Sequence, residues 1–176
     1  EKNTELWSLY HHNRISKETL IVERFRYPLQ RVGAYNDKLV LQLNADYLSV
    51  LSEQGELVPQ ARELLDYLKS RSYRLHIISN GFKEVQFKKM KSAGIENYFE
   101  KIILSDEVGV NKPHPDIFRY ALNKTGSSKN TSLMIGDNYD ADILGAMRSG
   151  LDQVYFNPLQ KQIPDKFPTY EVTGII

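Results

Sequence analysis

Three short groups of polar residues, each placed directly after an apolar run, carry the side chains of this sequence that could do chemistry. The first is Ser79-Asn80-Gly81, the second leads to Lys112, and the third contains Asp137 and Asp142. A hydroxyl, free backbone amides and an ammonium group suit a phosphate. Carboxylate oxygens suit Mg²⁺, which often bridges to the phosphate of a substrate. Together these residues predict a Mg²⁺-dependent site for phosphoryl transfer.

The apolar runs before these groups are predicted to be strands, because each is short and is followed by a helical pattern. This alternation predicts an α/β fold with a Rossmann-like, mostly parallel sheet flanked by helices. In such sheets ligands bind at the carboxyl ends of the strands, where the three polar groups lie. The predicted strands cover residues 73–79, 101–105, 132–136, 153–157 and 170–172, and the predicted helices between them cover 83–93, 115–125 and 140–149.

The first third of the chain shows helical patterns and no alternating strand pattern. Ser16 is predicted to cap one helix, within which Pro28 predicts a kink or a restart. Asp37 is predicted to cap the next helix. We therefore expect two domains, a helical module over residues 1–57 and an α/β core over residues 58–176.

The composition excludes several function classes. The 176 residues include no cysteine, so disulfides, thiolate metal sites and a cysteine nucleophile are excluded. The 23 basic and 22 acidic residues give no support for binding a nucleic-acid backbone. The apolar runs are too short to span a membrane, and no basic-then-apolar leader opens the sequence. We expect a cytoplasmic protein whose partner is a small molecule; the sequence does not indicate the oligomeric state.

Three segments resemble the last three motifs of the haloacid dehalogenase-like (HAD) hydrolase superfamily. They read RLHIISNGF, DEVGVNKPHPDIF and LMIGDNYDADILGAMRSGL, and they occur in the family's order. The run LWSLYHHNRISKETLIVERF in the helical module is similar to the phosphatase branch that contains bacterial pyrimidine 5′-nucleotidases. Residues 1–57 would then be the C-terminal part of the helical cap of this family.

The resemblance implies a role for each site residue. Ser79 and the two backbone amides that follow it would bind the phosphoryl oxygens, and Lys112 would neutralise their charge. Asp137 would be a direct Mg²⁺ ligand, while Asp142 would hold a metal-bound water or position Lys112. The implied activity is hydrolysis of phosphomonoesters through an aspartyl-phosphate, with nucleoside monophosphates or similar small phosphorylated metabolites as substrates.

The resemblance also implies a nucleophile that these residues do not supply. In the family an Asp-x-Asp pair directly follows the first, central strand; its first aspartate attacks phosphorus and its second is the general acid/base. The nearest candidate here, Asp46, lies on a helical stripe and has Leu48 where the second aspartate would be. Because loss of a central strand would leave backbone groups unpaired, we expect a preceding segment to carry the motif.

Two alternatives to the phosphatase stay open. A metal-independent 2-haloacid dehalogenase would carry Ser-Ser-Asn in its last motif, so Gly136-Asp137 argues against that activity. A non-catalytic pseudoenzyme or binding module would fit a chain that truly has no nucleophile.

Several other residues are predicted to have simpler roles. Asp140 is predicted to cap the helix that follows it. In isolation Lys112 would be an ordinary loop lysine, but between the other two motifs it is predicted to be functional. Lys112→Ala is therefore expected to damage turnover and to leave stability nearly unchanged. The aromatic residues of the helical module, Trp7 among them, could stack a nucleobase, although helical spacing favours core packing for Phe25 and Tyr47.

Overall fold

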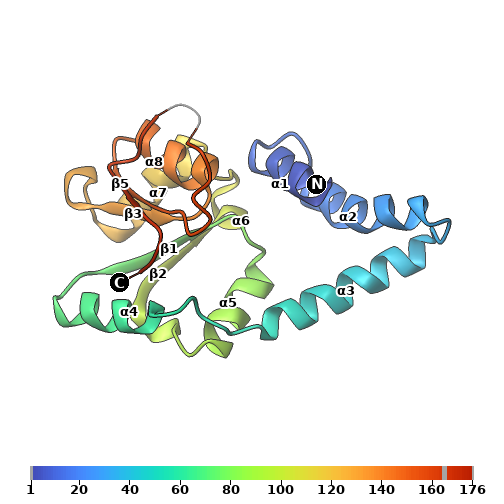
Figure 1. Ribbon diagram of the computed structural model, residues 1–176, viewed down its shortest axis with the longest axis horizontal. Coiled ribbons are helices and arrows are strands. Elements are labelled where there is room, and N and C mark those ends of the chain that lie inside the picture. The colour runs from blue at the N-terminus through green and yellow to red at the C-terminus, as the bar shows by residue number, and fades with distance from the viewer. Residues whose placement is uncertain (1, 164–165, 176) are drawn as a thin grey trace.

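The computed structural model describes residues 2–163 and 166–175, which form a helical module and an α/β core (Figure 1). The module consists of α1 (Lys2–His11), α2 (Lys17–Arg31) and α3 (Asp37–Glu53). The core strands are β1 (Leu75–Ser79), β2 (Phe99–Leu104), β3 (Leu133–Gly136), β4 (Asp152–Phe156) and β5 (Tyr170–Val172). The core helices are α4 (Ala61–Ser70), α5 (Lys83–Ser92), α6 (Ser105–Val108), α7 (Pro115–Thr125) and α8 (Gly145–Arg148). They are joined by two short 3₁₀ helices, η1 (Glu96–Tyr98) and η2 (Lys129–Thr131), and by a π-helix, η3 (Tyr139–Leu144).

All the strand pairs are parallel, which confirms the predicted fold class. β1 pairs with β2, and β3, β4 and β5 form a second sheet in that order. Helices α5 and α7 follow β1 and β2, and α7 ends at Gly126, which has a left-handed backbone conformation. Because the paired strands are parallel, their carboxyl ends lie on the same side of each sheet.

The two sheets each leave one strand edge without a strand partner among the described residues. β1 is bonded to β2 alone and β3 to β4 alone. On β3 the apolar side chains of Leu133 and Ile135 are both 49% exposed. An unpaired edge leaves backbone N–H and C=O groups without ladder partners, so β1 and β3 can each accept a further strand.

The helical module confirms one predicted cap and corrects one predicted break. Ser16 caps α2, because its Oγ accepts a hydrogen bond from the backbone N–H of Thr19 at 3.2 Å. The helix does not restart at Pro28 but continues to Arg31. Pro28 lies in the last turn, where its missing N–H removes a single helical hydrogen bond.

The cap of α3 lies one residue earlier than predicted. Asn36, not Asp37, accepts a hydrogen bond from the N–H of Leu39, at 3.2 Å. Phe25 and Tyr47 pack edge to face with ring centroids 5.9 Å apart, as their helical spacing predicts.

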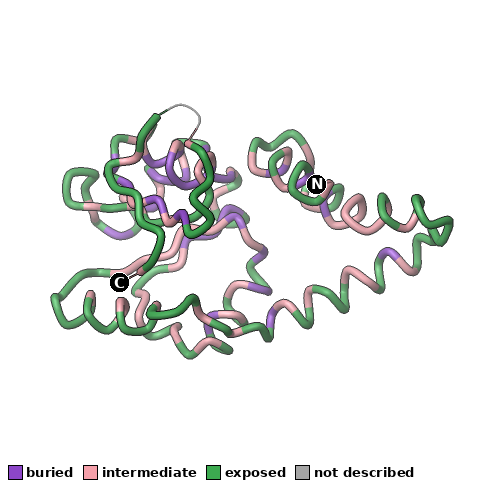
Figure 2. The backbone as a smooth tube through the Cα atoms, in the orientation of Figure 1, coloured by how far each residue is buried: buried purple, intermediate pink, exposed green. Residues whose placement is uncertain are grey.

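Buried residues gather in the core and where the module touches it, whereas the far part of α2 and α3 is largely exposed (Figure 2). One cluster fills the core around Ile103, Phe118 and Ala146. A second joins Leu6 and Leu20 of the module to Phe82 of the core. None of the described helices is long and apolar enough to cross a membrane.

Candidate active site

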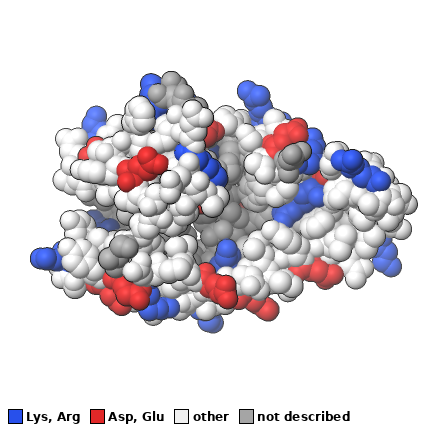
Figure 3. All heavy atoms as spheres, viewed as in Figure 1, with Lys and Arg blue, Asp and Glu red and all other residues white. Residues whose placement is uncertain are grey.

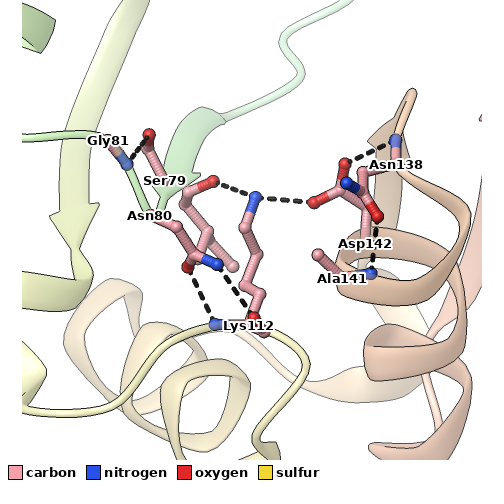
Figure 4. A network of polar contacts seen from close by, with 8 residues as sticks. Ser79, Asn80, Gly81, Lys112, Asn138, Ala141 and Asp142 are labelled. Atoms are coloured by element: carbon pink, nitrogen blue, oxygen red, sulfur yellow. Dashed lines mark hydrogen bonds and ion pairs between the residues drawn. The ribbon is translucent and has the colours of Figure 1, made fainter. Parts of the chain in front are cut away.

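The ends of β1 and β3 meet at the side chain of Lys112 (Figure 4). Its ammonium group donates a hydrogen bond to the carbonyl oxygen of Ile78 at 2.7 Å and lies 2.6 Å from Oδ1 of Asp142. The side chains of Lys112 and Asp142 are only 10% and 7% exposed. An ammonium group has three N–H donors, so one remains for a further acceptor. The fold thus holds a buried positive charge where two strands end.

Asn80 fixes the backbone that carries this lysine. Its Oδ1 accepts a hydrogen bond from the N–H of Lys112 and its Nδ2 donates one to the carbonyl of Lys112, both at 2.8 Å. Asn80 is buried, so water cannot replace these bonds. The sequence predicts a role for the backbone amide of Asn80 and none for its side chain; the signal for that side chain is an amide directly after a strand.

Ser79 and Gly81 form a tight turn at the end of β1. The N–H of Gly81 donates a hydrogen bond to Oγ of Ser79 at 3.0 Å. The Ser79 hydroxyl keeps its own hydrogen to donate. The Gly81 amide is already engaged, so binding a phosphoryl oxygen through it, as predicted, requires that amide to change partner.

Asp142 is held against the end of β3. Its Oδ2 accepts a hydrogen bond from the N–H of Asn138 at 3.1 Å, and its Oδ1 faces Lys112. A Cβ added to Gly136 would lie 2.6 Å from Cγ of Asp142, which explains why glycine precedes Asp137. Of the two roles predicted for Asp142, this geometry favours positioning Lys112.

Asp137 is the predicted metal ligand whose carboxylate stays free. It is exposed at the end of β3, and no side-chain hydrogen bond or ion pair involves it within residues 2–163 and 166–175. In the same residues no three His, Cys, Asp or Glu side chains lie close enough to enclose a metal. Mg²⁺ commonly binds proteins through one or two carboxylates, with water and phosphate completing its shell. The donor chemistry therefore fits Mg²⁺ held through Asp137.

Asp140 does not cap the following helix, contrary to the prediction. Asn138 takes that place, because its Oδ1 accepts a hydrogen bond from the N–H of Ala141 at 2.9 Å. The Asp140 carboxylate instead lies 3.2 Å from Nε2 of His12 in the helical module. No local spacing relates these two residues, so the sequence alone could not reveal the contact.

The turn between α1 and α2 docks beside the residue that precedes Lys112. The Nδ2 of Asn111 donates hydrogen bonds to the carbonyl of Tyr10 at 2.7 Å and to Oδ1 of Asn13 at 3.1 Å. Nearby, Lys17 pairs with Asp106 at 3.2 Å. A pocket of about 410 Å³ lies at this junction. The surface is hollowed between module and core, and charges of both signs are scattered over the face in Figure 3.

Comparison with known proteins shows the family. Residues 16–156 match the model of the haloacid dehalogenase-like hydrolases. The chain belongs to this family. The HAD-like hydrolase is 31% identical to the pyrimidine 5′-nucleotidase YjjG of Escherichia coli over 98% of the chain and 76% of the relative. It is 32% identical to the pyrimidine 5′-nucleotidase PynA of Streptococcus pneumoniae over 97% of the chain and 72% of the relative.

A solved structure supports the same conclusion. The HAD-hydrolase YfnB of Bacillus subtilis, described as bound to magnesium, matches with a TM-score of 0.88 and 29% identity. The match covers 98% of the chain and 75% of YfnB. The predicted family and its α/β fold are thereby confirmed, and the protein is an enzyme of the hydrolase class.

Proposed function

We propose that this HAD-like hydrolase cleaves phosphomonoesters, with nucleoside monophosphates or similar small phosphorylated metabolites as substrates. The observation that carries the proposal is the buried ammonium of Lys112, held between the carbonyl of Ile78 and Asp142 at the end of β1, the strand that ends at Ser79. A fixed cation with a spare N–H donor is suited to stabilise the negative charge of a phosphoryl group in the transition state. Two relatives that are named pyrimidine 5′-nucleotidases support the substrate class.

The attacking carboxylate is best supplied by a strand between β1 and β3. Lys112 contacts both the end of β1 and Asp142 just after β3, so the two unpaired edges are neighbours at the site. A strand docked there and ending in Asp-x-Asp would present its first carboxylate next to Lys112. That carboxylate would form an O–P bond as the ester P–O bond breaks, and the second aspartate would protonate the leaving oxygen. Water would then hydrolyse the aspartyl-phosphate and release phosphate.

Each site residue then has a separate role in the reaction. Ser79 donates its hydroxyl hydrogen to a phosphoryl oxygen, and Lys112 donates its remaining N–H. Asp142 keeps the ammonium in place. When bound through Asp137, Mg²⁺ would supply further positive charge beside the phosphoryl oxygens. Residues 1–57 would act as the helical cap over a core of residues 58–176, and the cytoplasmic location stays a prediction.

The test is Mg²⁺-dependent phosphate release from a panel of phosphomonoesters by the full protein, including the segment expected to carry Asp-x-Asp. Asp137→Asn is expected to lower turnover by at least about 100-fold and to weaken the dependence on Mg²⁺. Asp116→Asn is the matched control and should retain activity, because within the described part of the chain Asp116 forms ion pairs with His114 and Arg119, beside and on its own helix. Full turnover in Asp137→Asn would contradict the metal role. Halide release from 2-haloacids without Mg²⁺, or no hydrolysis at all, would contradict the proposed function.

A further inference from the structure

Two aromatic side chains of the helical module lie one turn apart on α1, facing the loop that follows β1. The rings of Trp7 and His11 are 5.6 Å apart. Trp7 also stacks on Phe82, with ring centroids 5.9 Å apart and an angle of 28° between the planes. Phe82 directly follows the Ser79–Gly81 turn. Trp7 and His11 are each only partly buried, so neither residue is sealed from solvent.

His11 is placed near the phosphoryl site by its two neighbours in the chain. The carbonyl of Tyr10 accepts the hydrogen bond from Asn111, and His12 pairs with Asp140. Both core partners lie within two residues of Lys112 or Asp142, so α1 reaches the edge where the strands end. Burial, and then the charge of Lys112, lowers the pKa of His11, so its imidazole is neutral at neutral pH. A neutral imidazole offers one donor and one acceptor.

We propose that Trp7 and His11 bind the leaving group of the phosphoester, and that this group is a nucleoside whose base stacks on Trp7 and hydrogen-bonds to His11. The inference rests on the proposed function, since it places the phosphate at Ser79 and Lys112. Nucleobases present a flat π-face together with donors and acceptors on their edges, which matches an indole beside a neutral imidazole. A glycerol or sugar phosphate has no such face and gains nothing from this pair.

Binding can be measured without turnover through the fluorescence of Trp7, the one tryptophan among these 176 residues. Titration of the full protein with uridine 5′-monophosphate should quench the fluorescence in a saturable way, and Trp7→Phe should lose this quenching. Glycerol 3-phosphate should leave the fluorescence unchanged. Free tryptophan titrated in parallel corrects for absorption by the nucleotide. Absence of saturable quenching by the nucleotide would overturn the inference, and so would equal quenching by both phosphates.

Kinetics on the same two substrates then separates base recognition from a loss of packing. Trp7→Ala and His11→Ala should each lower kcat/KM for the nucleotide by about 10-fold or more, and change the value for glycerol 3-phosphate by less than about 3-fold. Trp7→Phe and His11→Gln, which keep a stacking face and a hydrogen-bonding group, should recover part of the loss. Equal losses on both substrates would overturn the inference and assign α1 a purely structural role.

The two proposals fail in different ways. Saturable quenching without any phosphate release would contradict the proposed hydrolysis and support the base site. Release of phosphate from both substrates with the same kcat/KM in every variant would support the hydrolysis and overturn the base site.

Discussion

The polar network at the strand ends and the ion pair between His12 of the module and Asp140 of the core differ chiefly in burial. Asn80, Lys112 and Asp142 are buried and hold one another at 2.6–2.8 Å. The ion pair between His12 and Asp140, by contrast, joins side chains that are 37% and 42% exposed. Water can replace an exposed ion pair at little cost but cannot replace a buried one. The buried network therefore fixes the chemistry, whereas the ion pair between His12 and Asp140 contributes little to holding the module in place.

The largest expected effect is loss of the buried carboxylate. Asp142→Ala leaves the Lys112 ammonium buried with only the Ile78 carbonyl as partner, which should lower the free energy of unfolding by about 3–5 kcal/mol. Asp116→Ala removes a carboxylate that pairs with Arg119 at the surface and should cost less than about 1 kcal/mol. Urea denaturation of both variants checks the contrast. If both variants lost a similar free energy of unfolding, the buried ion pair of Asp142 would contribute no more to stability than the surface pair of Asp116.

Lys112 shows where prediction from sequence succeeds and where it stops. The alternation of apolar runs and helices correctly predicts parallel strands, the order of the site residues and the edge at which they meet. Whether the lysine is exposed depends on Asn80 and Asp142, about 30 residues away on either side. The expectation that Lys112→Ala leaves stability unchanged is therefore replaced by a destabilisation, because Asp142 would keep an unpaired buried charge.

The contacts across the module–core boundary could not be predicted for the same reason. Asn111 and Tyr10 are about 100 residues apart in the chain, and neither belongs to a local pattern that marks a contact. Caps were predicted to within two residues at Asp37 and Asp140, because the neighbouring Asn36 and Asn138 can accept the same hydrogen bonds. Sequence patterns thus predict where a helix begins, whereas the folded structure determines which neighbouring side chain caps it.

The second prediction compares an asparagine in each region. Asn80→Ala leaves the buried N–H and C=O of Lys112 without partners and should cost about 2–4 kcal/mol. Asn36→Ala removes the exposed cap of α3 and should cost about 1 kcal/mol. Denaturation midpoints of the two variants measure the difference. If Asn36→Ala cost as much as Asn80→Ala, the module would contribute to stability as strongly as the core.

A third prediction concerns Asn111, the buried side chain that ties the module to the core. Asn111→Ala removes its bonds to Tyr10 and Asn13 and should cost about 1–2 kcal/mol. Lys17→Ala removes the partly exposed pair with Asp106 and should cost less than about 1 kcal/mol. The emission of Trp7 reports on the module in both variants. If Trp7 reports unfolding of the module in Asn111→Ala at a lower urea concentration than unfolding of the core, Asn111 couples the unfolding of the module to that of the core. If module and core still unfold together in Asn111→Ala, the apolar contacts around Phe82 couple them instead.

The smallest expected effect is a pH dependence that arises within the core, at His76 of β1. Both ring nitrogens of His76 are buried without a hydrogen-bond partner among the described residues, and burial lowers the pKa of the ring below its ordinary value of 6.5. At a pH between the lowered pKa of the folded chain and the ordinary pKa of the unfolded chain, His76 binds a proton in the unfolded chain but not in the folded chain. The contribution of His76 to stability is therefore complete above about pH 6.5 and is lost as the pH falls toward the lowered pKa.

His76→Gln should remove this dependence, so its free energy of unfolding should fall less than that of the wild type between about pH 7 and pH 5. Ile77→Val, in the same strand, changes no titratable group, so it serves as the control and should keep the wild-type slope. Urea titrations at several pH values measure both slopes. A wild-type slope in His76→Gln would mean that the cost of burying a charge at β1 is already relieved by solvent, as expected if the unpaired edge of this strand stays open to water.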